Sequence, residues 1–96
     1  MVALERFDLR IPGCRSLKQK RHILTTLTAA LRQRFPVSVA EVDHQDLWQR
    51  TAIGVSAVSR ESYHVKKVLQ QVERYIATWP RVEFIDSAFS LHYPEE

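Results

Sequence analysis

The chain has 96 residues, 45% of them hydrophobic, with 14 Lys and Arg against 11 Asp and Glu and a formal net charge of +3. This length suits one hydrophobic core, hence a single domain over residues 1–96, and the composition is not that of a disordered chain. No apolar run approaches the ~20 residues of a transmembrane helix, and charges come too early for a secretory signal. We therefore expect a cytoplasmic protein with no membrane partner.

The first predicted elements are a strand and a long helix. Residues 2–11 alternate apolar and charged side chains, which is typical of a half-buried strand, and Pro12 with Gly13 ends it. Ser16 followed by Gln19 is the pattern of a capping box, so a helix should begin there. Its apolar residues recur at helical spacing until Pro36, which stops the helix.

Two strands and a second helix follow. Segments 37–42 and 51–58 are rich in Val, Ile and Ala and predict strands, joined by the polar stretch 43–50. A second helix is expected from about Arg60, with Ser59 as its N-cap and Pro80 as its end.

A last strand is expected over 82–92, before an acidic tail. The order β-α-β-β-α-β requires both helices to bury their apolar stripes on one side of a single sheet, because a chain this short cannot supply a third layer. We predict a ferredoxin-like α+β two-layer sandwich, whose four-stranded antiparallel sheet has strands one and three in the centre. Gly54 is expected to let a helix sit close on the third strand.

The charge distribution is uneven. Between Asp8 and Glu41 there is no acidic residue, so this segment carries +7 while the rest of the chain sums to −4. Cations at a helix start each cost about 0.3–1 kcal/mol, because the helix N-terminus is already positive. An anion, above all a phosphate, would offset that cost. The predicted anion-binding or RNA-binding residues are Arg10, Arg15, Ser16, Lys18, Lys20, Arg21 and His22.

Two alternatives stay open for this basic segment. It could be a solvated face that serves solubility, although this does not explain seven cations without one acid. Lys20 differs from its neighbours because it projects toward the apolar stripe. Its stem could cover the core edge or it could support the turn, in place of a direct role as an anion ligand.

A second constellation comprises Glu41, Asp43, His44 and Asp46. These groups could hold a divalent metal or act as an acid–base pair, or the aspartates could cap turns in a polar hairpin. The apolar residues Leu47 and Trp48 beside them favour a protein interface, which could pair this acidic loop with the basic cluster of a second copy. The predicted interface residues are Asp43, His44, Asp46, Leu47, Trp48 and Arg50, and we expect a homodimer or other homo-oligomer. No catalytic residue, metal or cofactor is predicted.

Two long motifs carry a family resemblance: LRIPGCRSLKQKR at Leu9–Arg21 and SVAEVDHQDLWQR at Ser38–Arg50. With these motifs the chain resembles the YlxP-like family of bacterial proteins of unknown function. The resemblance implies a ferredoxin-like domain, often encoded near translation-initiation and ribosome-maturation genes, and supplies no catalytic mechanism. The sequence departs from the family pattern at Cys14, where a small residue is common, and we interpret this lone thiol as structural.

Three function classes compete. The first is an RNA-binding or ribosome-associated module that grips phosphates with the basic surface. Base stacking on the sheet is not expected, because strands one and three offer only Phe7. The second is a small phosphate-handling enzyme of acylphosphatase type. Its mechanism requires an asparagine to orient water, and this chain contains no asparagine. The third is a homo-oligomeric adaptor. The absence of asparagine is also a weak sign of a thermophilic source.

Overall fold

The computed structural model describes residues 1–94 and contains two helices and four strands. The elements are β1 (Val2–Arg10), α1 (Leu17–Arg34), β2 (Ser38–Asp43), β3 (Arg50–Val58), α2 (Ser62–Ala77) and β4 (Glu83–His92). Each predicted element is present, with bounds within about two residues of those expected. The last two residues of the expected acidic tail, Glu95 and Glu96, lie outside the described part of the chain.

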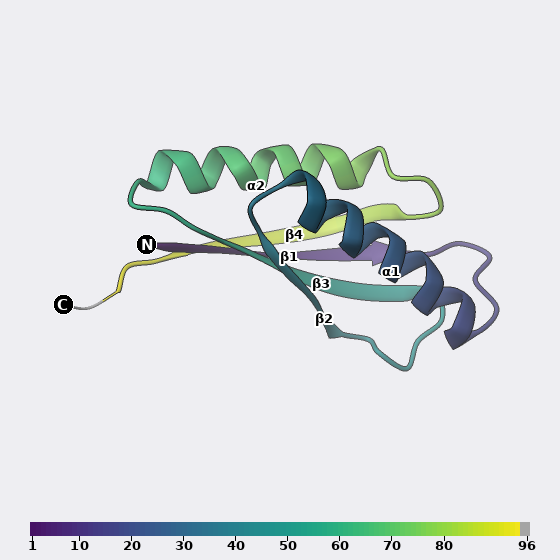
Figure 1. Ribbon diagram of the computed structural model, residues 1–96. Helices are drawn as coiled ribbons and strands as arrows, with labels where there is room; N and C mark the ends of the chain where they lie inside the picture. Colours follow the sequence, from purple (N-terminus) through teal and green to yellow (C-terminus); the bar gives the residue numbers. More distant parts are fainter. Residues whose placement is uncertain (95–96) are drawn as a thin grey trace.

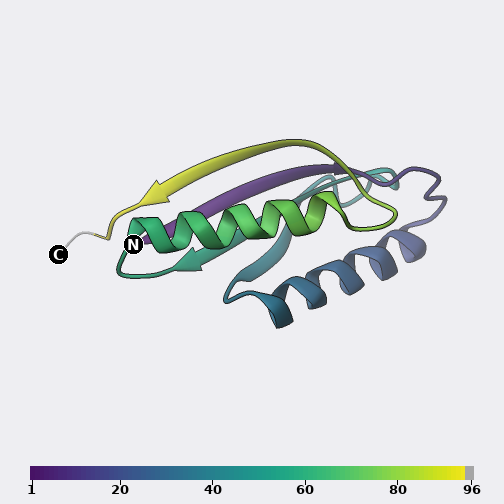
Figure 2. The same ribbon diagram turned by 90° about the horizontal axis from the view of Figure 1, so that it is seen from above.

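The strands form one antiparallel sheet in the order β2-β3-β1-β4. Both helices lie on the same side of this sheet and run in opposite directions, as Figure 1 and Figure 2 show. The other side of the sheet is left uncovered and is called the open face below. This arrangement confirms the ferredoxin-like α+β fold and the central placement of the first and third strands. Within residues 1–94, no helix is both long and apolar enough to cross a membrane.

The two helices start differently. Ser16 is the N-cap of α1, and its hydroxyl oxygen accepts a hydrogen bond from Gln19 N at 3.0 Å, as the sequence predicts. The expectation that Ser59 caps α2 is wrong, because Glu61 occupies the N-cap position. Ser59 instead accepts a bond from Glu61 N at 3.3 Å, so it stabilises the turn before the helix.

Most of the core lies between the helices and the sheet. In α2 the apolar residues Val65, Val68, Leu69, Val72 and Ile76 are buried, and in α1 the apolar residues are buried from Ile23 to Leu31. A smaller apolar cluster joins the loop after β1 to the first half of α1; its members are Ile11, Cys14, Ile23, Leu24 and Val82. Cys14 is 1% exposed, which agrees with a structural thiol. This second cluster holds the beginning of α1 against the end of the sheet.

Gly54 does not face a helix, contrary to the expectation. It pairs with Arg6 on the open face, where a Cβ atom added to it would lie 3.0 Å from Cγ1 of Val42. Val42 occupies the extra position of a β-bulge in β2, between Glu41 and Asp43. The bulge leans Val42 over the neighbouring strand, so the missing side chain at Gly54 accommodates a strand and not a helix.

Candidate functional site

Two loops meet at the end of the molecule where α1 begins. Ile11 N donates to the carbonyl of Gln49 at 2.9 Å, and the side chain of Gln49 donates to the carbonyl of Cys14 at 3.3 Å. Figure 1 shows the β2–β3 loop below the first turns of α1. The structure therefore brings together, at one end of the fold, the two sequence motifs that carry the candidate residues.

Three exposed cations cluster at the start of α1. Arg15, Lys18 and Arg21 are all exposed, and none forms an ion pair with a carboxylate of residues 1–94. The first turn of α1 contains no acidic residue, so the positive end of the helix is not neutralised from within the helix. We call these three residues the α1 cluster; their charge is available to an external anion.

Lys20 lies apart from this cluster. Its side chain is 2% exposed, and its ammonium pairs with Glu41 Oε2 at 2.9 Å. The same ammonium donates to the carbonyl oxygens of His44 at 2.6 Å and Gln45 at 3.5 Å. Burial of the ammonium among these partners leaves it no room for an external phosphate, so Lys20 anchors the β2–β3 loop beneath α1. Of the alternatives that the sequence leaves open, the structure favours the supporting role.

Arg10 also separates from the α1 cluster. It is the cross-strand partner of Arg50, and its guanidinium lies 3.6 Å from the exposed carboxylate of Glu83. Because Leu9 faces the helices, Arg10 faces the open side of the sheet. Nε of Arg50 is buried and has no hydrogen-bond partner among the described residues. Two like charges placed opposite each other destabilise a strand pair, and here the carboxylates of Glu83 and Asp8 lie near the two arginines and offset part of that repulsion.

The remaining residues of the predicted anion set flank the α1 cluster. Ser16 uses its oxygen as an acceptor within the cap and keeps its own hydroxyl hydrogen free to donate. His22 is exposed and lines a small hollow of about 210 Å³ together with Trp79 and Arg81. These two side chains lie beside the three cations and could assist them.

The carboxylates of Glu41 and Asp43 lie on opposite faces of the sheet. Glu41 faces the helices, where it pairs with Lys20 and accepts a 2.6 Å bond from the hydroxyl of Thr51. Asp43 faces the open side, where it bonds to Arg6. No set of three or more His, Cys, Asp or Glu within residues 1–94 is placed to hold a metal. The structure therefore does not assemble the metal cluster that the spacing allowed.

Arg6 is the centre of a polar network on the open face that the sequence does not reveal. Its guanidinium lies 3.1 Å from a carboxylate oxygen of Asp8 and 3.1 Å from one of Asp43. The bond from Arg6 lowers the pKa of Asp8. The pKa of Asp43 is lowered first by the backbone N–H of His44 and then by Arg6. His44, at φ 62°, places its ring within 3.8 Å of both carboxylates. The hydrogen bonds and ion pairs among these groups hold the start of the β2–β3 loop in place.

The tip of the β2–β3 loop is exposed. Leu47 is 48% and Trp48 50% exposed, and they line a shallow hollow of about 400 Å³ with Asp46 and Arg50. The exposure that the interface prediction requires is therefore present. Asp43 and His44, also predicted for the interface, are half-buried in the Arg6 network and stand behind this tip.

The open face offers no aromatic platform on its central strands. Phe7, the one aromatic residue of β1, is fully buried against the helices, and β3 contains none. Between them these strands present Leu4, Arg6 and Asp8 beside small residues of β3. Recognition of single strands by stacking on these strands, as in RNA-recognition motifs, has no side chains to carry it.

The largest feature that sequence reasoning missed is the charge of the helical layer. Together α1 and α2 contain eight Lys and Arg residues and one carboxylate, Glu73. Glu73 is turned toward β4, where it accepts a 3.3 Å bond from Ser87. Counting charges over the two predicted helices, instead of over one continuous segment, would have shown that the second helix extends the basic surface.

The fold and these residues define an α+β protein of the ferredoxin-like class. The family model described as "Protein of unknown function (DUF503)" matches residues 2–89. The chain is also 35% identical, over 83 residues, to the "Uncharacterized protein YlxP" of Bacillus subtilis (strain 168), a match that covers 86% of this chain and 90% of that protein. The chain belongs to the DUF503 family, and the resemblance drawn from the two motifs is confirmed.

Proposed function

We propose that this protein is a non-catalytic, cytoplasmic RNA-binding module that grips the phosphates of structured RNA with the α1 cluster. The observation that carries the proposal is the set of three exposed cations at the positive end of α1 with no carboxylate partner among residues 1–94. Phosphate contacts of this kind supply affinity and strong salt dependence without reading sequence.

The support beneath the α1 cluster and the make-up of the sheet are consistent with this proposal. Lys20 holds the β2–β3 loop against α1, so the cations stand on a rigid support. The lack of exposed aromatics on β1 and β3 favours recognition of backbone and shape over stacking of bases. The ligand that fits these properties is a folded RNA or a ribonucleoprotein.

Charge reversal tests the proposal. The double variant Arg15→Glu with Lys18→Glu should remain folded, because both side chains are exposed, and should lose binding to a structured RNA in fluorescence anisotropy. The matched control is Arg60→Glu with Lys66→Glu, which changes the net charge equally at exposed sites away from the α1 cluster. Normal RNA binding by the first double variant would refute the proposal.

A second function is compatible with the first: self-association through the loop tip. The half-exposed Leu47 and Trp48 form an apolar tip in a polar loop, which is typical of interface anchors. Trp48→Ala should lower the mass observed in sedimentation at high protein concentration, with Tyr63→Ala, a change of another exposed aromatic, as the control. A wild type that stays monomeric at high concentration would contradict this function.

A further inference from the structure

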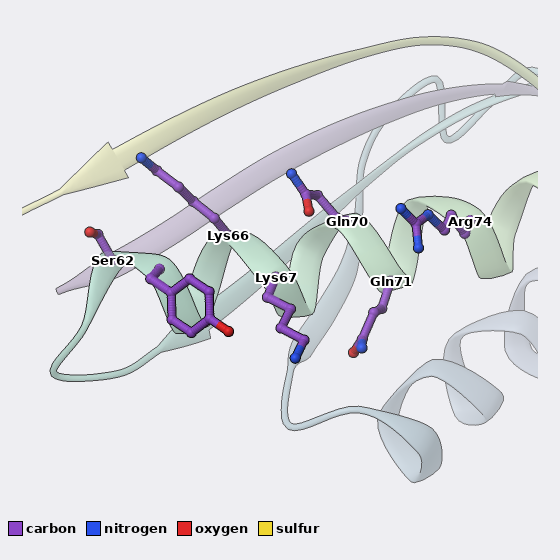
Figure 3. Close-up of a pocket in the computed structure, with 7 residues that line it drawn as sticks. Ser62, Lys66, Lys67, Gln70, Gln71 and Arg74 are labelled. Atoms are coloured by element: carbon purple, nitrogen blue, oxygen red, sulfur yellow. The ribbon is translucent and has the colours of Figure 1, made fainter.

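A shallow groove runs between the end of α1 and the outer side of α2. One part, of about 750 Å³, is lined by Arg34 and Phe35 and by a row of α2 side chains that includes His64, Gln71 and Tyr75. An adjoining hollow of about 620 Å³ along α2 shares Gln71 and Arg74 with it and adds both Lys66 and Lys67 (Figure 3). We call this feature the helix groove; its polar and aromatic lining comprises Arg34, His64, Lys67, Gln71, Arg74 and Tyr75.

The lining of the helix groove is positive. Arg34, Lys67 and Arg74 are exposed, and none pairs with a carboxylate of the described chain. The guanidinium of Arg34 stacks 5.0 Å from the centroid of the Tyr75 ring, which holds it in place while its N–H groups stay free to donate. The groove thus presents fixed and flexible cations with amide donors from Gln71, a combination that suits phosphate oxygens.

Lys66 provides an internal comparison. Figure 3 shows Lys66 and Gln70 on the side of α2 toward β4, whereas Lys67 and Gln71 point toward α1. Lys66 borders the 620 Å³ hollow too, but it also lines a second hollow together with the carboxyl residues Glu5 and Glu73. Two adjacent lysines of α2 therefore differ in their surroundings, because Lys66 lies near carboxyl groups and Lys67 points toward the cations at the end of α1.

The helix groove and the α1 cluster lie at opposite ends of α1. With a rise of 1.5 Å per residue, the backbone positions of the cluster and of Arg34 are roughly 20 Å apart. The molecule is elongated, with a long dimension of 47 Å, so one extended ligand can reach both places on the helical layer. Two separate cation groups on one layer favour a long polyanion with regularly spaced charge over a single small anion.

We propose that the helix groove is a second contact for the RNA backbone, so that the protein bridges two runs of phosphates on one double-stranded or folded RNA. This inference rests on the proposed function and adds the requirement that the RNA be long enough to reach both contacts. A short stem engages the α1 cluster alone. A longer duplex engages both contacts, much as double-stranded RNA-binding domains contact successive grooves by shape.

The test compares two RNA probes, a hairpin with a stem of about 6 base pairs and a duplex of about 20 base pairs. With three phosphates neutralised at each contact, log affinity should fall with log salt with a slope of about −3 for the hairpin and about −5 for the duplex. Lys67→Glu with Arg74→Glu should reduce duplex affinity by roughly tenfold or more and bring the slope to between about −3 and −4, because Arg34 remains. The same variant should bind the hairpin almost as the wild type does.

Lys66→Glu and Lys67→Glu form the matched pair, because long-range electrostatics affects both equally. Duplex affinity should fall more for the Lys67 variant. Equal slopes for the two probes, or equal losses of duplex affinity in the two lysine variants, would refute the helix groove as an RNA contact. The proposed role of the α1 cluster would be unaffected by either result. If the wild type bound neither probe in a salt-dependent way, the proposed function itself would fail. Displacement of the duplex by polyglutamate at equal charge concentration would instead indicate an acidic protein segment as the occupant and overturn the RNA assignment.

Discussion

Replacing Lys20 by Met tests whether this residue is a structural anchor or an anion ligand. Met retains most of the apolar stem but removes the ammonium, so it breaks the 2.9 Å pair with Glu41 and the bonds to the carbonyls of His44 and Gln45. Removing one partner of a buried ion pair costs about 3–5 kcal/mol. The side chain of Glu41 is 23% exposed and keeps its bond from Thr51, so water can compensate in part. We expect a loss of about 2–4 kcal/mol in the free energy of unfolding.

Urea unfolding monitored by circular dichroism measures this loss, and hydrogen exchange should show faster opening of the β2–β3 loop. Lys18→Met is the control: because Lys18 is exposed at the positive helix end, its removal should change stability by no more than about 0.5 kcal/mol. Adding Glu41→Gln to Lys20→Met should recover part of the loss, because it removes the uncompensated charge. If Lys20→Met were as stable as Lys18→Met and lost RNA affinity instead, the anchoring role would be refuted.

Three further substitutions test other parts of the account by chemical denaturation. Burial raises the pKa of Glu5, and nearby Glu73 adds to the increase. The free energy of unfolding of the wild type, relative to that of Glu5→Gln, should therefore fall as the pH rises through the pKa of Glu5. The variant should be more stable by on the order of 1 kcal/mol at pH 7, and this advantage should vanish at acid pH. A difference in stability that does not change with pH would contradict the raised pKa of Glu5. Ser16→Ala should cost about 1 kcal/mol through loss of the N-cap, and an unchanged stability would argue against the cap. Gly54→Ala should change stability by less than about 1 kcal/mol, because the exposed Val42 can move aside, whereas a much larger loss would mean that a rigid element packs on Gly54.

The sequence predicts the fold well because its local signals agree with one another. The alternation in residues 2–11, the Ser16 cap and the two proline stops each specify an element, and their order allows only one compact arrangement of two layers. The prediction of Ser59 as the N-cap of α2 is wrong because Ser59 and Glu61 are both compatible with a turn before a helix. Which of the two begins the helix depends on the tertiary path of the chain.

The candidate site is less predictable, because it depends on which face each side chain takes. The β-bulge after Glu41 lets this carboxylate face the helices while Asp43 faces the open side, so neighbours in sequence became members of separate networks. Periodicity does indicate that Lys20 points toward the core, but its partners come from a loop more than twenty residues away. The helix groove joins Arg34 to Arg74 across two elements, which no local pattern can reveal.

The central claim is that the α1 cluster binds RNA phosphates, and the salt dependence of affinity tests it most directly. For a short structured RNA, three to four neutralised phosphates should give a slope of log affinity against log salt of roughly −2 to −4. Arg15→Ala, Lys18→Ala and Arg21→Ala should each flatten that slope by about one without changing which sequences are preferred. A wild type whose affinity for RNA does not change with salt, or three variants whose slopes equal that of the wild type, would contradict the claim.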